Sequence, residues 1–212
     1  MATLRLVVDS VLAATLTLHG NDMNYLKWIA LLPVMIVVTI LTFPLAFVLP
    51  AFAQMREGWL NNGNSWGKGW YLPKWLNLFQ TPDNSLDGDD GWKNEHWQWR
   101  YKLPTAICTY VGRIGWLWRN PGYGVGVVRF DSAVPVTATY TGNAAVNDSP
   151  GVEGWCLVHA GGLFQLVWVK RVGASKCFYF NLGWNIKGLI NDPRNKYTAT
   201  YAFSPRISTW KD

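Results

Sequence analysis

The run from Trp28 to Met55, WIALLPVMIVVTILTFPLAFVLPAFAQM, contains no charged residue. A helix needs about 20 mostly apolar residues to cross a bilayer, and this run is long enough. Core helices of soluble proteins rarely extend this far without a charge. The run therefore predicts a transmembrane helix within residues 25–55, kinked at its prolines or beginning after Pro33, because proline removes a backbone donor.

The same residues also resemble a secretory signal. The triplet AFA at residues 51–53, ahead of Gln54, is a small-x-small cleavage pattern, and Lys27 supplies a positive charge before the run. Cleavage there would remove residues 1–53. We favour an uncleaved anchor, because the apolar run is longer than a usual signal core.

Charges around the run leave the membrane orientation open. Lys27 precedes it, whereas Arg56 and Lys68 follow it, and this count favours a cytoplasmic C-terminal domain. The signal-like pattern points the other way. Residues 1–24 form a separate segment, in which the apolar stretch from Leu4 to Leu18 is too short to cross and packs on the body or lies on the membrane.

Residues 56–80 are rich in tryptophan, in a chain that contains 14. Tryptophan and tyrosine prefer the level of the lipid headgroups, so this segment is predicted to be a juxtamembrane collar. A carbohydrate-stacking surface is the alternative for exposed rings. The predicted membrane-interface residues are Trp59, Trp66, Trp70, Tyr71 and Trp75.

Beyond the collar, the apolar pattern has the period of two that is typical of strands. Alternation predicts strands over Val134–Tyr140 and Lys196–Phe203, and a hairpin joins the more apolar runs Gly162–Val172 and Lys176–Trp184. The main helix expected in this part is Thr105–Trp118. The predicted fold class is α+β, mainly β, with an N-terminal transmembrane helix before a small antiparallel β-domain over residues 81–212.

Charge and cysteine content restrict the partners. The formal net charge is +6, which suits anionic lipid headgroups, whereas the lack of a Lys/Arg run makes nucleic acid an unfavoured partner. The three cysteines have no C-x-x-C spacing and are expected to be buried thiols. The partners expected from composition are the lipid bilayer and further copies of the chain.

The β-domain opens with an acidic stretch, TPDNSLDGDDGWKNEHW, over residues 81–97. Its oxygens resemble a calcium loop, but Asn94 stands where an EF-hand requires glutamate, so a looser calcium loop is the metal hypothesis. The acids with His96 also allow acid–base chemistry. The candidate metal ligands are Asp83, Ser85, Asp87, Asp89, Asp90 and Glu95.

We favour a third interpretation of this stretch, a polar elbow whose turn-forming side chains bond their own backbone. Its negative charge is expected to pair with the basic body, at Arg100, Arg113 or Arg119. The segment RNPGYG, which contains Arg119, Asn120, Pro121 and Tyr123, predicts a tight turn that brings Arg119 to the elbow and to Asp87.

Four segments carry a resemblance: LPKWLNLFQTPDNSLDGDDGW from residue 72, GWLWRNPGYGVG at residues 115–126, NLGWNIKG and FSPRIS. In these segments the chain resembles a family of small uncharacterised bacteriophage proteins with an N-terminal hydrophobic segment and a TPDN-x-L-x-GD motif. The resemblance implies a product of an infected cell or of a virion, which adds host envelope or virion proteins to the expected partners, and it implies no activity.

The leading functional hypothesis is a phage-encoded single-pass membrane protein that acts by binding at the bilayer surface of the infected cell. Envelope modification, superinfection exclusion and DNA entry are the roles considered. One alternative is a virion component whose apolar segment is buried against other subunits. The other is a metal-dependent enzyme that uses the cluster from Asp83 to His96. The chain shows no nucleophile motif or phosphate loop, so binding is favoured over catalysis.

Overall fold

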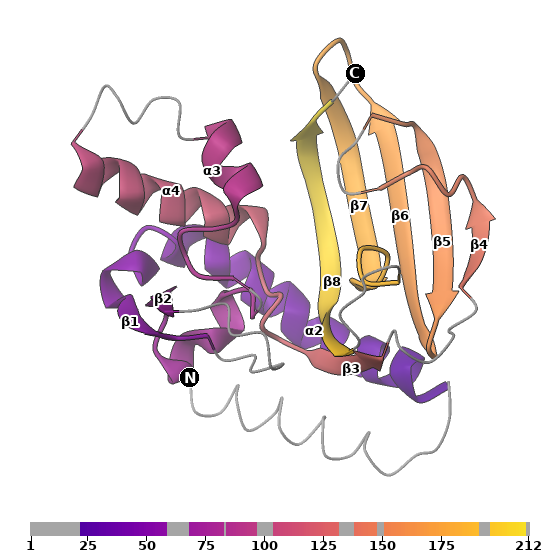
Figure 1. The fold of residues 1–212 in the computed structure, drawn as a ribbon, viewed down its shortest axis with the longest axis horizontal. Coiled ribbons are helices and arrows are strands. Elements are labelled where there is room, and N and C mark those ends of the chain that lie inside the picture. Colours follow the sequence, from indigo (N-terminus) through magenta and orange to yellow (C-terminus); the bar gives the residue numbers. More distant parts are fainter. Residues whose placement is uncertain are drawn as a thin grey trace. The chain divides into compact units, whose positions relative to one another are not determined.

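The computed structural model describes residues 22–58, 68–82, 84–96, 104–131, 138–147, 151–190 and 196–210. The chain divides into two compact units (Figure 1). We call Met1–Pro33 with Gly126–Asp212 the sheet unit, and Val34–Val125 the helical unit. One helix, α2, contributes its first part to the sheet unit and its second part to the helical unit.

Helices and strands of both types are present. The helices are α2 (Asp22–Leu45), α3 (Asp90–His96) and α4 (Thr105–Arg119), with 3-10 helices η1 (Leu49–Phe52) and η2 (Lys74–Phe79). The strands are β1 (Gln54–Glu57), β2 (Lys68–Tyr71), β3 (Val127–Asp131), β4 (Thr139–Gly142), β5 (Gly154–Ala160), β6 (Leu163–Arg171), β7 (Lys176–Trp184) and β8 (Lys196–Thr209).

The sheet unit is built on one six-stranded sheet with the order β3-β8-β7-β6-β5-β4, in which all neighbours are antiparallel. The predicted hairpin is confirmed as β6 and β7, and the predicted strand Lys196–Phe203 is the first part of β8. The strand predicted over Val134–Tyr140 falls mostly on residues outside the described ranges, and β4 begins at Thr139. The α+β, mainly antiparallel β class is confirmed.

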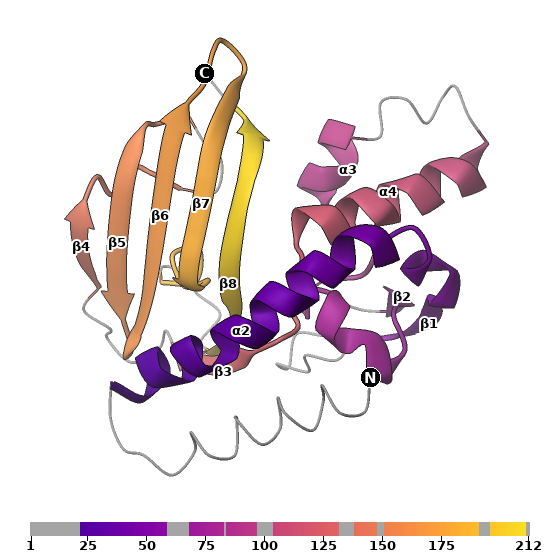
Figure 2. The same ribbon diagram turned by 180° about the vertical axis from the view of Figure 1, so that it is seen from behind.

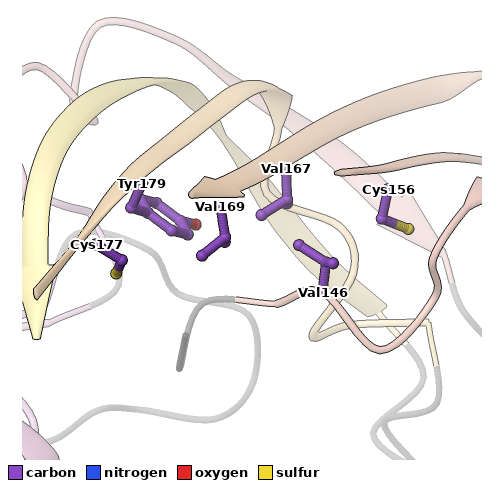
Figure 3. Packing of buried hydrophobic residues seen from close by; sticks show 6 residues of the cluster. All are labelled: Val146, Cys156, Val167, Val169, Cys177 and Tyr179. Carbon is purple, nitrogen blue, oxygen red and sulfur yellow. The ribbon is translucent and has the colours of Figure 1, made fainter. Parts of the chain in front are cut away.

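One face of this sheet, which we call the inner face, is covered by the chain itself. Its core is a cluster of small and aromatic side chains, shown in Figure 3. The members are Val146, Cys156, Val167, Val169, Cys177 and Tyr179. The cysteines are buried and free, as the sequence predicts. Burial raises the pKa of the Cys177 thiol, which favours the unreactive protonated form.

Gln165 holds the backbone of the segment that follows β7 over the inner face. Its side-chain oxygen accepts hydrogen bonds from the backbone N–H groups of Ile186 and Lys187, at 2.9 and 2.7 Å. Its amide nitrogen donates to Asn181 Oδ1 at 3.0 Å. Gln165 and Asn181 are both buried, so this network satisfies polar groups that would otherwise be costly in the core.

Within the sheet unit, the first turns of α2 cross the foot of the opposite, outer face of the sheet (Figure 2). Tyr25 stacks on Phe164 and Trp28 stacks on Tyr201, with ring centroids 4.5 and 5.4 Å apart. Trp28 also donates its indole N–H to the carbonyl of Ala202 at 3.3 Å. Stacking and hydrogen bonds therefore bind the start of α2 to the sheet.

In the helical unit, the predicted helix over residues 25–55 is shorter than expected, because α2 ends at Leu45 and β1 already begins at Gln54. Pro44 removes the N–H that would bond to the carbonyl of Ile40. Pro50 lies in the first turn of η1, where a missing N–H costs little. The predicted helix Thr105–Trp118 is confirmed as α4.

The predicted division at residues 24, 55 and 80 stays a prediction, and the two units group the chain in another way. Residues 81–125, expected in the β-domain, belong with the second part of α2, and the sheet unit resumes at Gly126. The elbow and the RNPGYG turn thus lie in the helical unit.

Candidate membrane-binding surface

Both faces of α2 are apolar, although only one is buried. Ala46, just beyond the helix, continues the buried stripe, whose spacing follows the helical period. The buried residues are Trp28, Leu31, Val34, Met35, Val38, Thr42 and Ala46. The exposed large side chains are Leu26, Ile29, Ile36, Val37, Ile40, Leu41 and Phe43. A helix that is apolar all round is typical of a core or a bilayer, and here no part of the described chain covers the exposed face.

In the helical unit, the exposed stripe of α2 continues into neighbouring elements. Phe47 packs edge-to-face on Trp118 of α4, with centroids 5.2 Å apart, and Phe52 packs on Trp75 at 6.2 Å. We define the apolar surface as the exposed apolar side chains of this unit. They are Ile36, Val37, Ile40, Leu41, Phe43, Phe47, Val48, Phe52, Met55, Trp70, Trp75, Ile107, Val111 and Trp118.

The end of α2 lies on this surface, and helix ends leave carbonyls without helical partners. One of these carbonyls, and a second one in the turn just beyond α2, receive exposed side-chain donors from α4. Trp118 donates its indole N–H to the carbonyl of Phe43 at 2.9 Å, and Tyr110 donates its hydroxyl to the carbonyl of Phe47 at 2.7 Å. On a solvated surface, water molecules could donate hydrogen bonds to these carbonyls equally well. In hydrocarbon, each carbonyl without a hydrogen bond would cost several kcal/mol. The two donors therefore make this helix end compatible with lipid.

The first charge after the apolar run is directed inward. Arg56 donates to the carbonyl of Leu72 at 2.7 Å and to Asn77 Oδ1 at 2.9 Å, and its guanidinium lies 5.0 Å from the ring centre of Tyr71. Burial lowers the pKa of Arg56, and the neighbouring Tyr71 partly offsets this. These contacts hold the guanidinium within the helical unit.

The predicted collar has mixed outcomes. Trp75 is exposed and belongs to the apolar surface, whereas Tyr71 is only 1% exposed and packs in the core under Arg56. Trp70 is also exposed, with the guanidinium of Arg113 4.9 Å from its ring centre. Trp59 and Trp66 lie outside the described residues.

The described part of the acidic stretch forms an elbow held by local bonds. Arg113 Nε donates to Asp87 Oδ1 at 2.7 Å, and Asp89 Oδ1 caps α3 by accepting the N–H of Trp92 at 2.7 Å. Asp90 pairs with Lys93 at 3.5 Å. The side-chain oxygen of Ser85 accepts from the backbone N–H of Asp87 at 3.3 Å.

As a metal site, this stretch is described only in part. Asp83 and the side chains of Glu95 and His96 lie outside the described parts of the structure. Among the residues that are described, no three His, Cys, Asp or Glu side chains gather into a group suited to a metal. Calcium binding therefore stays a prediction, while the bonds of Asp87 and Asp89 give each carboxylate a structural role.

The predicted contact of Arg119 with the stretch exists, but at a different residue. Its guanidinium lies 5.9 Å from the ring centre of Trp92 in α3, whereas Asp87 pairs with Arg113. Arg113 lies about two turns earlier on α4, and its side chain is 11% exposed against 25% for Asp87. Asn120 ends α4, and Pro121 and Tyr123 are buried in the predicted turn.

Replacing Asp87 by alanine is expected to destabilise the helical unit by about 2 kcal/mol, because Arg113 would lose its charged acceptor. In a chain of this size that corresponds to a melting temperature lower by about 4–8 °C. The fall should be equal in calcium and in chelator. Asp90→Ala, at a carboxylate whose side chain is 94% exposed, is the matched control and should change the melting temperature little. A calcium-dependent shift that Asp87→Ala abolishes would contradict the elbow and support a ligand loop.

A protein-family model described as a family of unknown function (DUF7338) matches residues 21–210. Neither the curated proteins nor the solved structures contain a significant match to the chain.

Proposed function

We propose that this chain, which belongs to the DUF7338 family and inherits no stated activity from it, is a membrane protein anchored through α2 that acts by binding at the bilayer surface. The observation that carries the proposal is the continuous exposed apolar face of α2 and α4. Monomeric soluble proteins rarely expose apolar patches of more than a few hundred Å², and larger ones mark interaction or membrane sites.

The length of α2 supports a single crossing as the finer form of this proposal. Its 24 residues would extend about 36 Å, against a hydrocarbon thickness of about 30 Å. The window from Asn24 to Leu45 has the hydropathy of a membrane span and is only 33% buried. A crossing would require α4 to enter or line the bilayer beside α2, and its exposed Ile107, Val111 and Trp118 are compatible with that. It would also require the hydrogen bonds of Asn24 and Trp28 with the sheet to open, because the strands follow α2 in the chain and would lie on the side of its C-terminal end.

The contacts of Trp28 support retention of the anchor. Trp28 is buried between α2 and β8, and the hydroxyl of Tyr201 donates to its carbonyl at 3.3 Å. Asn24 adds a hydrogen bond to the carbonyl of Gly162 at 3.1 Å. Cleavage after residue 53 would remove all of these contacts and leave Tyr201 without its stacking partner.

The resemblance to bacteriophage proteins makes the envelope of the infected cell the membrane that we propose. Envelope modification, superinfection exclusion and DNA entry are roles that a surface-binding protein can perform there. The alternative is a virion component, in which other subunits would cover the apolar surface. Mass spectrometry of purified particles separates these locations: abundant copies in particles would support the virion component, and absence would exclude it.

The test of the proposal is fractionation of the full chain followed by flotation with vesicles. We expect the chain in the membrane fraction after carbonate washing, and we expect it to float with purified vesicles. Recovery as a soluble protein that does not float would overturn the proposal.

Tags at the two ends of the chain test the finer topology. A crossing helix places the tags on opposite sides of the membrane, so protease added to one side removes only one of them. If both tags are removed from the same side, the single crossing is wrong, and α2 lies in the membrane plane instead.

A further inference from the structure

The outer face of the sheet is apolar far beyond the part that α2 covers. Register places its side chains in straight rows across β5, β6, β7 and β8. One row consists of Trp155, Trp168, Phe180 and Pro205, and the next row toward the foot consists of Leu157, Leu166, Leu182 and Phe203. Antiparallel sheets with one solvated face normally alternate apolar and polar residues, so these rows indicate a face that is covered in the working protein.

The tryptophans of the first row are exposed in the described structure, whereas the second row is half-buried. Trp155 is 45% exposed, Trp168 42% and Phe178, which lies toward the opposite end of the strands, 47%. Beside Phe178, Ile207 of β8 is also exposed. In Figure 2, the first turns of α2 cross the foot of the sheet. The uncovered area is roughly 20 Å by 20 Å, from strands about 4.8 Å apart and rows about 7 Å apart.

Insertion into hydrocarbon does not suit this face. It ends at β4, an edge strand of the sheet whose residues are all exposed. The outward backbone groups of an edge strand have no partners within the sheet, and lipid-exposed open edges are not tolerated in a bilayer core. A protein surface can cover the rows while leaving the edge in water.

The charged rim of the face is self-complementary. Lys170 pairs with Glu153 at 3.5 Å, and both side chains remain largely exposed, at 60% and 43%. In a two-fold interface the same patch meets itself, so Lys170 of one copy can approach Glu153 of the other. The apolar rows of both copies would then face each other about 10 Å apart, as two sheets do in a sandwich.

We infer that the outer face of the sheet binds the same face of a second copy of this chain. Pairing two areas of the estimated size would bury on the order of 1,000 Å² in total, which is at the lower limit for a specific interface. The aromatic rows supply the rigid rings that usually dominate such interfaces. This inference does not depend on membrane binding, because the apolar surface belongs to the helical unit.

Single-molecule photobleaching of the labelled full chain in vesicles tests the inference. We expect two bleaching steps for the wild type and one for Trp168→Arg, with a dimerisation constant weakened about 30-fold, as for an interface hot spot. Tyr140→Arg is the matched control, since it adds the same charge at an exposed ring of β4, where the register pairs it with Val158 of the inner face, and it should leave two steps. Phe178→Arg provides a second outer-face variant in case Trp168→Arg fails to fold.

Charge exchange identifies the facing pair. Glu153→Lys and Lys170→Glu chains, labelled in different colours and mixed, should colocalise with each other more often than either does with itself. Such a preference requires contact between copies, because each variant alone carries two like charges at this rim.

Three outcomes would overturn the inference: single bleaching steps for the wild type, two steps for both outer-face variants, or no preference between the mixed chains. A monomeric wild type whose vesicle binding is lost in Trp168→Arg would assign the face to the bilayer instead. If the chain proves soluble, sedimentation in solution replaces photobleaching, so the dimer is tested even when membrane binding fails.

Discussion

Replacing Ile40 by aspartate is expected to weaken binding of the full chain to vesicles by about 100-fold or more. Ile40 is 63% exposed on α2, in the middle of the uncharged run, so its side chain supports no core packing. Aspartate at the centre of a membrane helix costs about 3 kcal/mol, and isoleucine contributes a few tenths favourably. Aspartate is also too short to reach the headgroups. Flotation over a range of lipid concentrations measures the change.

The control for Ile40→Asp makes the same type of change away from the apolar surface. Val152→Asp adds an equal charge at an exposed aliphatic residue of the sheet unit and should float like the wild type. Circular dichroism should show that both variants fold. If Ile40→Asp binds vesicles as tightly as Val152→Asp, this face of α2 does not meet lipid, and a protein partner becomes the better explanation for it.

The elements that the sequence predicts best are those with a strong local signal. The β6–β7 hairpin and the helix Thr105–Trp118 follow from their apolar patterns, and the structure places them within a residue or two. The apolar run predicts α2 but not its end at Leu45. Where α2 ends depends on Pro44 and on the donors Trp118 and Tyr110, which are more than 60 residues away along the chain.

Ion pairs were harder to predict, because charge alone does not fix distance. The sequence contains several arginines that could pair with Asp87, and the predicted RNPGYG turn favours Arg119. The helical phase of α4 instead brings Arg113 to Asp87 and leaves Arg119 over Trp92. The signal that could have identified the Arg113–Asp87 pair was the spacing between the elbow and α4, a helix that the sequence predicts correctly.

The open outer face could have been suspected from the sequence. β6 and β7 carry apolar side chains at both odd and even residues, which is unusual for strands with one solvated face. That pattern predicts two buried faces. Inferring what covers the second face requires the strand register, because only the register shows that the rings form rows across four strands.

Replacing Gly124 by alanine is expected to destabilise the helical unit by about 3 kcal/mol, the upper end of the usual cost of overpacking. A Cβ at Gly124 would collide with the backbone carbonyl of Asn77 and lie 2.6 Å from that of Gln80. Backbone cannot yield as a side chain can, so η2 and the RNPGYG turn would have to separate. Chemical unfolding of the full chain in detergent measures the loss.

Gly188→Ala is the matched control, because a Cβ there would meet nothing within 4 Å. Equal stability of the two variants would mean that the RNPGYG turn does not approach η2 as closely as the structure shows. A large loss at Gly124 alone would give the motif a physical explanation. Gly122, with a φ of 73°, allows the chain to turn, and Gly124 allows the turn to pack directly on backbone. The motif would then be needed to build the unit that carries the apolar surface, whatever that surface binds.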